Sequence, residues 1–128
     1  MRPIAVVQPA GIYKPPSYVH AARAGDTLWI AGQVSRGADG KIVAPGDAAA
    51  QAKQCYANLR AVLAEAGADL SRVVKLTTYL VDRADAAAVT AVRLAEFGEW
   101  RPPHTGLIVA GLGAPEIRLE VEAVAWLG

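Results

Sequence analysis

The sequence predicts an α+β fold, in which two helices pack on one face of a mixed β-sheet. Residues 47–66 and 85–98 carry apolar side chains at helical spacing, and the stretches around them are short, apolar and rich in β-branched residues. Their order is three strands, a helix, a strand, a helix and two strands, which is typical of helices layered on a sheet. The length of 128 residues suits one core, so we interpret residues 1–128 as a single domain.

The first third of the chain is expected to form short strands between turns. Residues 6–18 hold three prolines and a glycine, which favours an ordered loop. Residues 18–22 and 27–34 follow as two strands around an Ala-Gly-Asp turn, a hairpin pattern, and residues 41–43 form a further short strand. Gly32 interrupts the second strand, which indicates a bulge or a close approach by another group.

Both helices have recognisable ends. Asp47 is a favourable N-cap for the first helix, and Gly67 stands where that helix should stop. A β-branched strand over residues 73–81 follows. The second helix is expected from Asp85 to about Gly98, with a weaker apolar stripe than the first.

The last third of the chain contains two apolar runs, residues 105–112 and 119–126, which we expect to be adjacent strands. The first run is apolar without alternation, which indicates a strand covered on both faces. In the second run, Glu120 and Glu122 fall on one face. His104 stands directly before the first run. An imidazole at the mouth of one strand and carboxylates within the next are groups that acid–base chemistry uses.

The number of helices available to cover the predicted sheet indicates that the chain associates with copies of itself. Two helices cover only one face of a sheet, yet residues 28–31 and 105–112 are apolar on both faces. The chain offers no further element to cover the second face. We therefore expect a second copy of the chain to cover it, in a closed symmetric assembly.

The composition excludes several classes of partner. The formal net charge is +1, from 13 basic and 12 acidic residues, so neither nucleic acid nor an anionic membrane is an expected partner. The first residues lack a signal-peptide pattern, and the lone Cys55 lies on the apolar stripe of a helix, so we expect a cytoplasmic protein with Cys55 in its core. Two histidines without ligand spacing predict no metal and no cofactor, and His20 is expected on a strand surface.

Several short motifs occur in a specific order and spacing along nearly the whole chain. They are Tyr18, the IAGQ of residues 30–33, Gln51 with Asn58, the AEAGADLSRVVKLTTYLVD of residues 64–82, Pro102-Pro103, and the final LEVEAVA of residues 119–125. In these the chain resembles the Rid family, also called the YjgF/YER057c/UK114 family. The resemblance implies a chorismate-mutase-like fold and a homotrimer, whose sheets form an inner barrel and whose ligand clefts lie at the subunit interfaces.

The resemblance also implies an activity, with one departure. The best-studied branch of the family hydrolyses reactive imines and enamines to a keto acid and ammonia, and an arginine in its Pro-Ala-Arg-Ser motif clamps the substrate carboxylate. The matching residues 102–105 read Pro-Pro-His-Thr, so His104 stands in place of the arginine. The family's asparagine and cysteine are matched by Thr90 and Gly106. We interpret the chain as an Arg-lacking relative, whose substrate is not a simple 2-imino acid if the arginine matters.

The candidate site follows from the same alignment. Glu122 is placed at the glutamate that positions the attacking water and is the predicted general base. His104 would give a proton to the leaving nitrogen or bind an oxyanion, and Tyr18 would orient a polar group of the substrate. The other expected substrate-binding residues are Gly32, Gln33, Thr90, Thr105 and Gly106. Structural alternatives stay open: Glu122 as an interface carboxylate, His104 as a solvated loop residue, and Tyr18 as a filler at a subunit contact.

Three classes of function are compatible with these residues. The first is a hydrolase or deaminase of a reactive small-molecule imine or enamine. The second is a non-catalytic trimer that binds a metabolite in its interfacial clefts. The third is an endoribonuclease, which the near-neutral charge disfavours because phosphate binding needs a basic surface.

Overall fold

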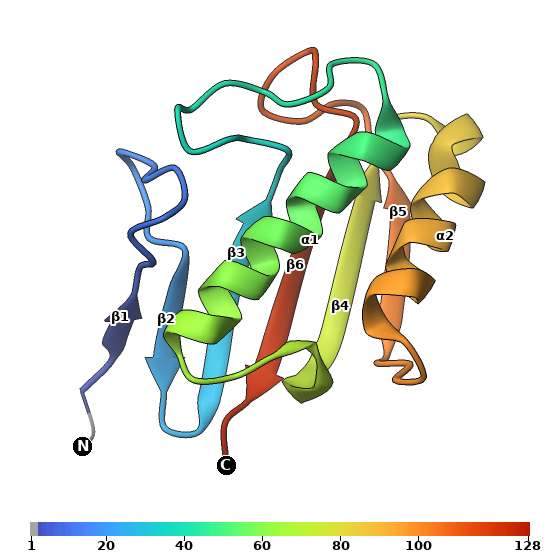
Figure 1. The fold of residues 1–128 in the computed structure, drawn as a ribbon. Helices are drawn as coiled ribbons and strands as arrows, with labels where there is room; N and C mark the ends of the chain where they lie inside the picture. Colours follow the sequence, from blue (N-terminus) through green and yellow to red (C-terminus); the bar gives the residue numbers. More distant parts are fainter. Residues whose placement is uncertain (1–2) are drawn as a thin grey trace.

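The computed structural model describes residues 3–128, which form one six-stranded mixed sheet with two helices on one face (Figure 1). The sheet order is β1-β2-β3-β6-β4-β5. The strands are β1 (Ala5–Val7), β2 (Ala21–Ala24), β3 (Thr27–Gln33), β4 (Val73–Leu80), β5 (His104–Ile108) and β6 (Leu119–Trp126). The helices are α1 (Ala48–Glu65) and α2 (Ala86–Phe97), with short 3-10 turns η1 (Leu70–Arg72) and η2 (Arg83–Asp85). The predicted α+β class with both helices on one face is confirmed.

The last two strands are not neighbours, so that prediction was wrong. β6 lies between β3 and β4 and runs antiparallel to both, whereas β5 pairs only with β4, in parallel. The crossover from β4 through α2 to β5 explains the parallel pairing, because a strand that follows a crossover helix returns in the same direction. β5 is therefore an edge strand, and all of its residues are exposed in the single chain.

The N-terminal half differs from expectation in three short segments. The strand expected over residues 18–22 is displaced to β2 (Ala21–Ala24). β1 (Ala5–Val7) pairs with β2 inside a stretch that was expected to be a loop. The expected strand over residues 41–43 is reduced to a single bridge between Arg36 and Ile42. β3 matches its prediction within one residue, and its pairing with β6 shifts register between Ile30 and Gln33. The bulge indicated by Gly32 is therefore present.

Both helices begin and end close to the predicted residues. The Asp47 carboxylate accepts a hydrogen bond from the backbone N–H of Ala50 at 3.0 Å, which is the expected N-cap. Gly67 has φ +76°, and Gly98, directly after α2, has φ +63°, a conformation that side chains rarely adopt.

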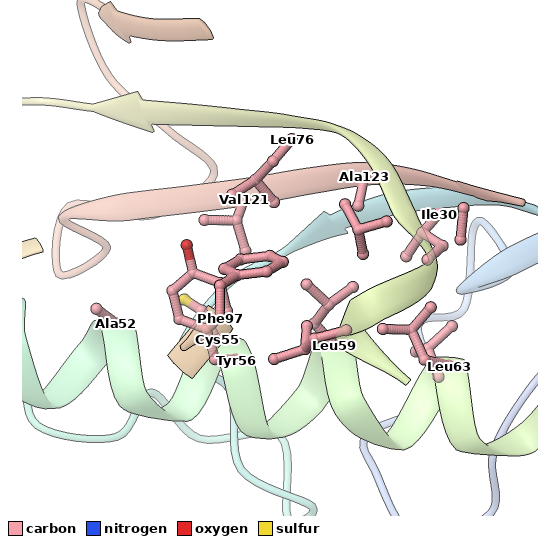
Figure 2. Packing of buried hydrophobic residues seen from close by; sticks show 14 of the residues in the cluster. Ile30, Ala52, Cys55, Tyr56, Leu59, Leu63, Leu76, Phe97, Val121 and Ala123 are labelled. Carbon is pink, nitrogen blue, oxygen red and sulfur yellow. The ribbon is translucent and has the colours of Figure 1, made fainter. Parts of the chain in front are cut away.

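The core lies between the helices and the covered face of the sheet (Figure 2). Leu59 and Leu63 of α1 are fully buried with Leu76 of β4 and Val121 of β6. Cys55 is also fully buried, as predicted, and burial raises the pKa of its thiol. Completely buried apolar side chains of this kind dominate the free energy of folding.

The other face of the sheet is open. Trp29, Leu107 and Trp126 are among its exposed apolar side chains, and Trp29 keeps 57% of its surface accessible. Both helices lie on the opposite side (Figure 1). The layer count therefore located the uncovered face correctly, and exposed apolar surface of this kind is typical of an interaction site.

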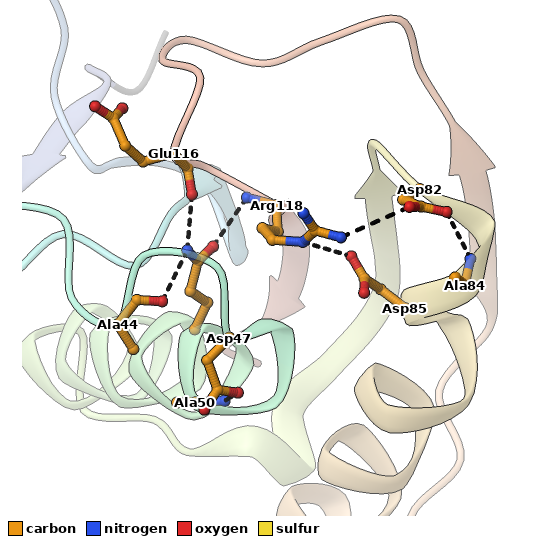
Figure 3. A network of polar contacts seen from close by, with 9 residues as sticks. Ala44, Asp47, Ala50, Asp82, Ala84, Asp85, Glu116 and Arg118 are labelled. Carbon is orange, nitrogen blue, oxygen red and sulfur yellow. Dashed lines mark hydrogen bonds and ion pairs between the residues drawn. The ribbon is translucent and has the colours of Figure 1, made fainter.

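A polar network fixes the start of β6 (Figure 3). The Gln51 side chain donates hydrogen bonds to the carbonyl oxygens of Ala44 and Glu116, at 3.2 and 2.8 Å, and accepts one from the backbone N–H of Arg118 at 2.9 Å. The Arg118 guanidinium in turn donates to the Asp85 carboxylate at 2.8 Å. Buried amides with satisfied partners hold a chain segment in one position. The network therefore sets the path of β6 two residues before Glu120.

Candidate functional site

The first candidate cluster is built around Glu120 on the open face of the sheet. Leu119, Val121 and Ala123 point into the core, so the intervening Glu120 and Glu122 project to the other side. A β-carbon placed on Gly32 would lie 2.5 Å from Cδ of Glu120. The bulge in β3 and the missing side chain at position 32 thus make the space in which the Glu120 carboxylate lies.

The Glu120 carboxyl group binds its proton more tightly in the protein than it would in water. Burial raises the pKa of this half-buried carboxyl, and the negative charge of Glu122 raises it further. The Tyr18 hydroxyl belongs to the same neighbourhood, because its pKa is raised by burial and then by the Glu120 charge. Tyr18 also lines a small cleft together with Gly32. A carboxylate, a phenol and the Gly32 backbone therefore lie close together at this end of β6.

Gln33 lines the same cleft, but its side chain is used for internal support. Its amide nitrogen lies 3.1 Å from Nδ1 of His20 and donates to the carbonyl oxygen of Ala31 at 3.0 Å. Nε2 of His20 lies 2.6 Å from the carbonyl oxygen of Tyr13, so Nε2 is the donor and Nδ1 the acceptor in this chain of bonds. His20 is buried, and its expected place on a strand surface was wrong.

Glu122 lies apart from the Tyr18 and Gly32 cluster. It accepts a short hydrogen bond from the Tyr79 hydroxyl and lines a shallow cavity together with Trp29 and Lys75. The predicted grouping of Glu122 with Tyr18 and Gly32 therefore needs correction, because Glu120 occupies that position. The alternation of side chains along β6 puts both glutamates on the same face, so it does not show which of them lies beside Gly32. The register of β6 against β3 decides this.

The second candidate cluster surrounds His104 at the edge of the sheet. Nε2 of His104 lies 2.9 Å from Oγ1 of Thr78, a buried residue of β4. A cavity of about 260 Å³ between β5 and α2 is lined by His104, Thr90 and Gly106. These three predicted residues are thus brought together. Thr105 points to the other face, where its hydroxyl accepts a hydrogen bond from the Lys75 ammonium.

The imidazole of His104 is neutral at neutral pH. Its pKa is lowered from 6.5 to about 4, mainly by burial and further by the positive charges of Arg93 and Lys75. A neutral imidazole offers one hydrogen-bond donor and one acceptor. His104 therefore suits the orientation of a polar substrate group better than the delivery of a proton.

The two clusters are separated within one chain. The Glu120 cluster faces the open side of the sheet, whereas the cavity beside His104 faces α2. β6 and β4 lie between β3 and β5. Strands in a sheet are spaced by about 4.8 Å, so Gly32 and β5 are about 14 Å apart. Glu120 itself lies on β6, two strands from β5, and its side chain projects to the face opposite that of His104, so the two clusters open on different sides of one copy.

Two features of the described part of the chain concern metal ions and membranes. Across residues 3–128, no group of three or more His, Cys, Asp or Glu side chains is arranged to hold a metal ion. Neither helix in this range is long and apolar enough to cross a membrane.

Comparison with known proteins identifies the family. A family model described as Endoribonuclease L-PSP matches residues 11–127. A RutC family protein of Pyrococcus abyssi (strain GE5 / Orsay) is 35% identical over 109 residues, which cover 85% of each chain. The chain therefore belongs to the Endoribonuclease L-PSP family, which is the Rid family that the sequence resembles.

Two further similarities extend this result. A protein of Mus musculus named 2-iminobutanoate/2-iminopropanoate deaminase is 33% identical over 111 residues, covering 87% of this chain and 82% of the mouse protein. The crystal structure of YEO7_yeast superposes with a TM-score of 0.92 at 28% identity, covering 98% of this chain and 100% of the yeast chain. The fold is thus that of known family structures over nearly the full length.

Proposed function

We propose that this protein hydrolyses the C=N bond of a reactive small-molecule imine, or of the imine tautomer of an enamine, and releases ammonia. Membership of the family and the similarity to a mouse protein named as an imine deaminase support this class of reaction. The observation that carries the proposal is the half-buried Glu120 carboxylate, held against Gly32 beside Tyr18. A carboxylate with a raised pKa in a cleft is a suitable general base near neutral pH.

The chemistry needs few groups. Glu120 takes a proton from water while the water oxygen attacks the imine carbon, which forms a carbinolamine. The protonated Glu120 returns that proton to the nitrogen, which completes the neutral carbinolamine. Glu120 then takes the hydroxyl proton of the carbinolamine and passes it to the amino nitrogen, so the C–N bond breaks as the C=O bond forms, and ammonia and a carbonyl product leave. Tyr18 orients a polar group of the substrate. His104, being neutral, holds the substrate through a hydrogen bond, and this replaces the sequence-based hypothesis that it supplies the proton.

The cleft is proposed to form between copies of the chain, in a homotrimer whose sheets line an inner barrel. The open face carries exposed apolar side chains that a second copy would bury. The separation of the two clusters supports the same arrangement, because the Glu120 cluster of one copy can face the His104 cluster of the next only in an assembly. A non-catalytic trimer that binds a metabolite would use the same clefts without turnover. Endoribonuclease activity is disfavoured by the net charge of +1.

The test compares two neighbouring glutamates. Imines are generated in situ by an amino-acid oxidase, and their decay and the release of ammonia are followed with wild-type protein, Glu120→Gln and Glu122→Gln. Loss of the general base should lower the rate by about 10²- to 10⁴-fold in Glu120→Gln. Glu122→Gln is the matched control, with the same change on the same strand face, and should stay within a few-fold of wild type. Full activity in Glu120→Gln would refute the proposed mechanism.

A further inference from the structure

Arg93 of α2 is a half-buried cation without a counter-ion. Its Nε is buried and has no hydrogen-bond partner, and Arg93 forms no ion pair within residues 3–128. The nearest acidic side chain on the same helix, Glu96, is paired with Arg60. Desolvating a charge without pairing it is costly, so such a group is expected to meet a partner that the chain itself does not supply.

The position of Arg93 on α2 explains its burial. It stands four residues after Val89 and four residues before Phe97, and both of these side chains are buried. Residues at this spacing lie on one face of a helix. Arg93 therefore occupies the face that α2 turns toward the sheet, where an apolar residue would be the usual choice.

Arg93 and His104 share two cavities. One has a volume of about 260 Å³ and also contacts Thr90 and Gly106. The other has a volume of about 200 Å³ and also contacts Trp100. After burial, the charge of Arg93 is the largest cause of the lowered pKa of His104, which places the guanidinium close to the imidazole. The guanidinium of Arg93 thus lies beside His104, the residue that stands where the best-studied branch of the family has an arginine.

The chemistry of this pair favours a carboxylate. A guanidinium presents two parallel N–H groups that match a carboxylate in geometry, and its single charge balances a monoanion. Arg83 also lines the larger cavity and Arg101 the smaller one, so the planar match between a guanidinium and a carboxylate, rather than the number of cations, favours a carboxylate here. The remaining walls of the larger cavity include Leu80, Val89 and Ile108, which suit a short aliphatic chain.

We propose that Arg93 is the carboxylate-binding residue of this protein, and that its ligands are small monocarboxylates with a short aliphatic chain. If the proposed function holds, the substrates are imino or enamino acids, because α2 provides the guanidinium that position 104 lacks. The binding itself does not depend on catalysis. It is therefore testable with ligands that carry no reactive nitrogen.

Calorimetry with butanoate and butanamide tests the proposal on the full-length protein. Butanamide has nearly the same shape without the charge, so wild-type protein should bind butanoate and bind butanamide much more weakly. Arg93→Gln should weaken butanoate binding by about ten- to a hundredfold, the effect of losing a charge-assisted pair. Arg93→Lys keeps the positive charge but loses the two parallel N–H donors of the guanidinium. Its affinity for butanoate should therefore lie between those of the wild type and Arg93→Gln.

Controls separate binding at Arg93 from general effects of charge and folding. Lys53→Gln removes a positive charge from an exposed position on α1 and should leave butanoate binding unchanged. In the NMR spectrum, butanoate should shift the Nε–H resonance of Arg93, and Arg93→Gln should raise the pKa of His104 from about 4, since one cause of its lowering is gone. Both readouts require folded protein, so a variant that fails to fold is recognised at once.

Three outcomes would overturn the inference. They are equal binding of butanoate and butanamide by the wild type, unchanged binding by Arg93→Gln, and tighter binding of inorganic phosphate than of butanoate. The inference and the proposed function fail separately. If Glu120→Gln keeps full turnover while Arg93→Gln loses butanoate, only the mechanism is wrong. If Arg93→Gln binds butanoate normally while Glu120→Gln is inactive, only the role of Arg93 is wrong.

Discussion

In the Glu120 and His104 clusters, the same physical cause shifts the pKa of the titratable group in opposite directions. Burial disfavours charge in both, so it raises the pKa of the Glu120 carboxyl and lowers that of the His104 imidazole. The carboxylate becomes a better proton acceptor, whereas the imidazole becomes a fixed neutral donor and acceptor. This difference in protonation is the basis of the proposed roles, namely proton transfer for the Glu120 cluster and ligand binding for the His104 cluster.

The surroundings of the two clusters differ in charge as well. Glu120 has Glu122 as its charged neighbour, whereas His104 has the cations Arg93 and Lys75. An anionic ligand would therefore be drawn to the His104 side and repelled from the acidic side. If both clusters meet in one cleft, a carboxylate-bearing imine would lie with its carboxylate on Arg93 and its imine carbon toward Glu120.

Beyond the Glu120→Gln test, the largest effect is expected from Gly32→Ala, which disturbs the Glu120 cluster. The new β-carbon would lie 2.5 Å from Cδ of Glu120, so the carboxylate has to move by about 1 Å, and a displacement of that size costs about a hundredfold in rate. Imine turnover by this variant should fall by that factor, while butanoate binding persists. Circular dichroism and thermal unfolding check that the fold is retained. Unchanged turnover would show that the place of Glu120 against Gly32 is unimportant.

A change of pH is expected to have an intermediate effect, in this case on protein stability. It tests the His104 cluster. The pKa of His104 is 6.5 when unfolded and about 4 when folded, so the unfolded chain binds a proton more readily. The contribution of neutral His104 to stability is complete above pH 6.5 and is lost as the pH falls toward 4. Because the side chain is partly exposed, the loss is smaller than the full shift implies.

Chemical denaturation of wild type and His104→Gln measures this contribution. Between pH 7 and pH 4.5 the wild type should lose more stability than the variant, and an NMR titration should place the pKa of His104 well below 6.5. Equal losses in the two proteins, together with an imidazole that titrates at its ordinary pKa, would contradict the partly desolvated, cation-flanked environment of His104.

The smallest effect is expected from Gly106→Ala, the counterpart of Gly32→Ala in the His104 cluster. A β-carbon on Gly106 meets only Cε1 of His104, at 3.4 Å, which is close to ordinary contact. Turnover and butanoate affinity should each change by no more than a few-fold. A hundredfold loss here, equal to that of Gly32→Ala, would mean that the two glycines are equivalent and that the comparison between the clusters is mistaken.

Local patterns in the sequence predicted the elements well, and failures arose where long-range pairing decides. The caps and apolar spacing of α1 and α2 depend on nearby residues, so their bounds could be predicted. The place of β6 between β3 and β4 depends on a crossover, and β5 and β6 were wrongly expected to be adjacent. Strands that follow one another in the sequence are usually neighbours in a sheet, but β5 and β6 are not.

The sequence predicted which candidate residues lie together on one side of the sheet but not which glutamate lies beside Tyr18 and Gly32. His104, Thr90 and Gly106 do share a cavity, as the alignment suggested. The choice between Glu120 and Glu122 depends on the register with β3, in which Gln33 lies opposite Val121 after a bulge, and alternation alone does not reveal it. Arg93 had a readable signal, since it stands midway between two apolar residues of the buried face of α2.

Complementation between two inactive variants tests the central claim most directly, namely that each site combines Glu120 of one copy with His104 and Arg93 of another. Glu120→Gln and Arg93→Gln proteins are mixed under conditions that exchange subunits, and imine turnover is measured before and after. If the halves come from different copies, random mixing restores both intact halves in about a quarter of the sites. Recovery of that fraction is the predicted result, and no recovery in demonstrably mixed oligomers would contradict the account.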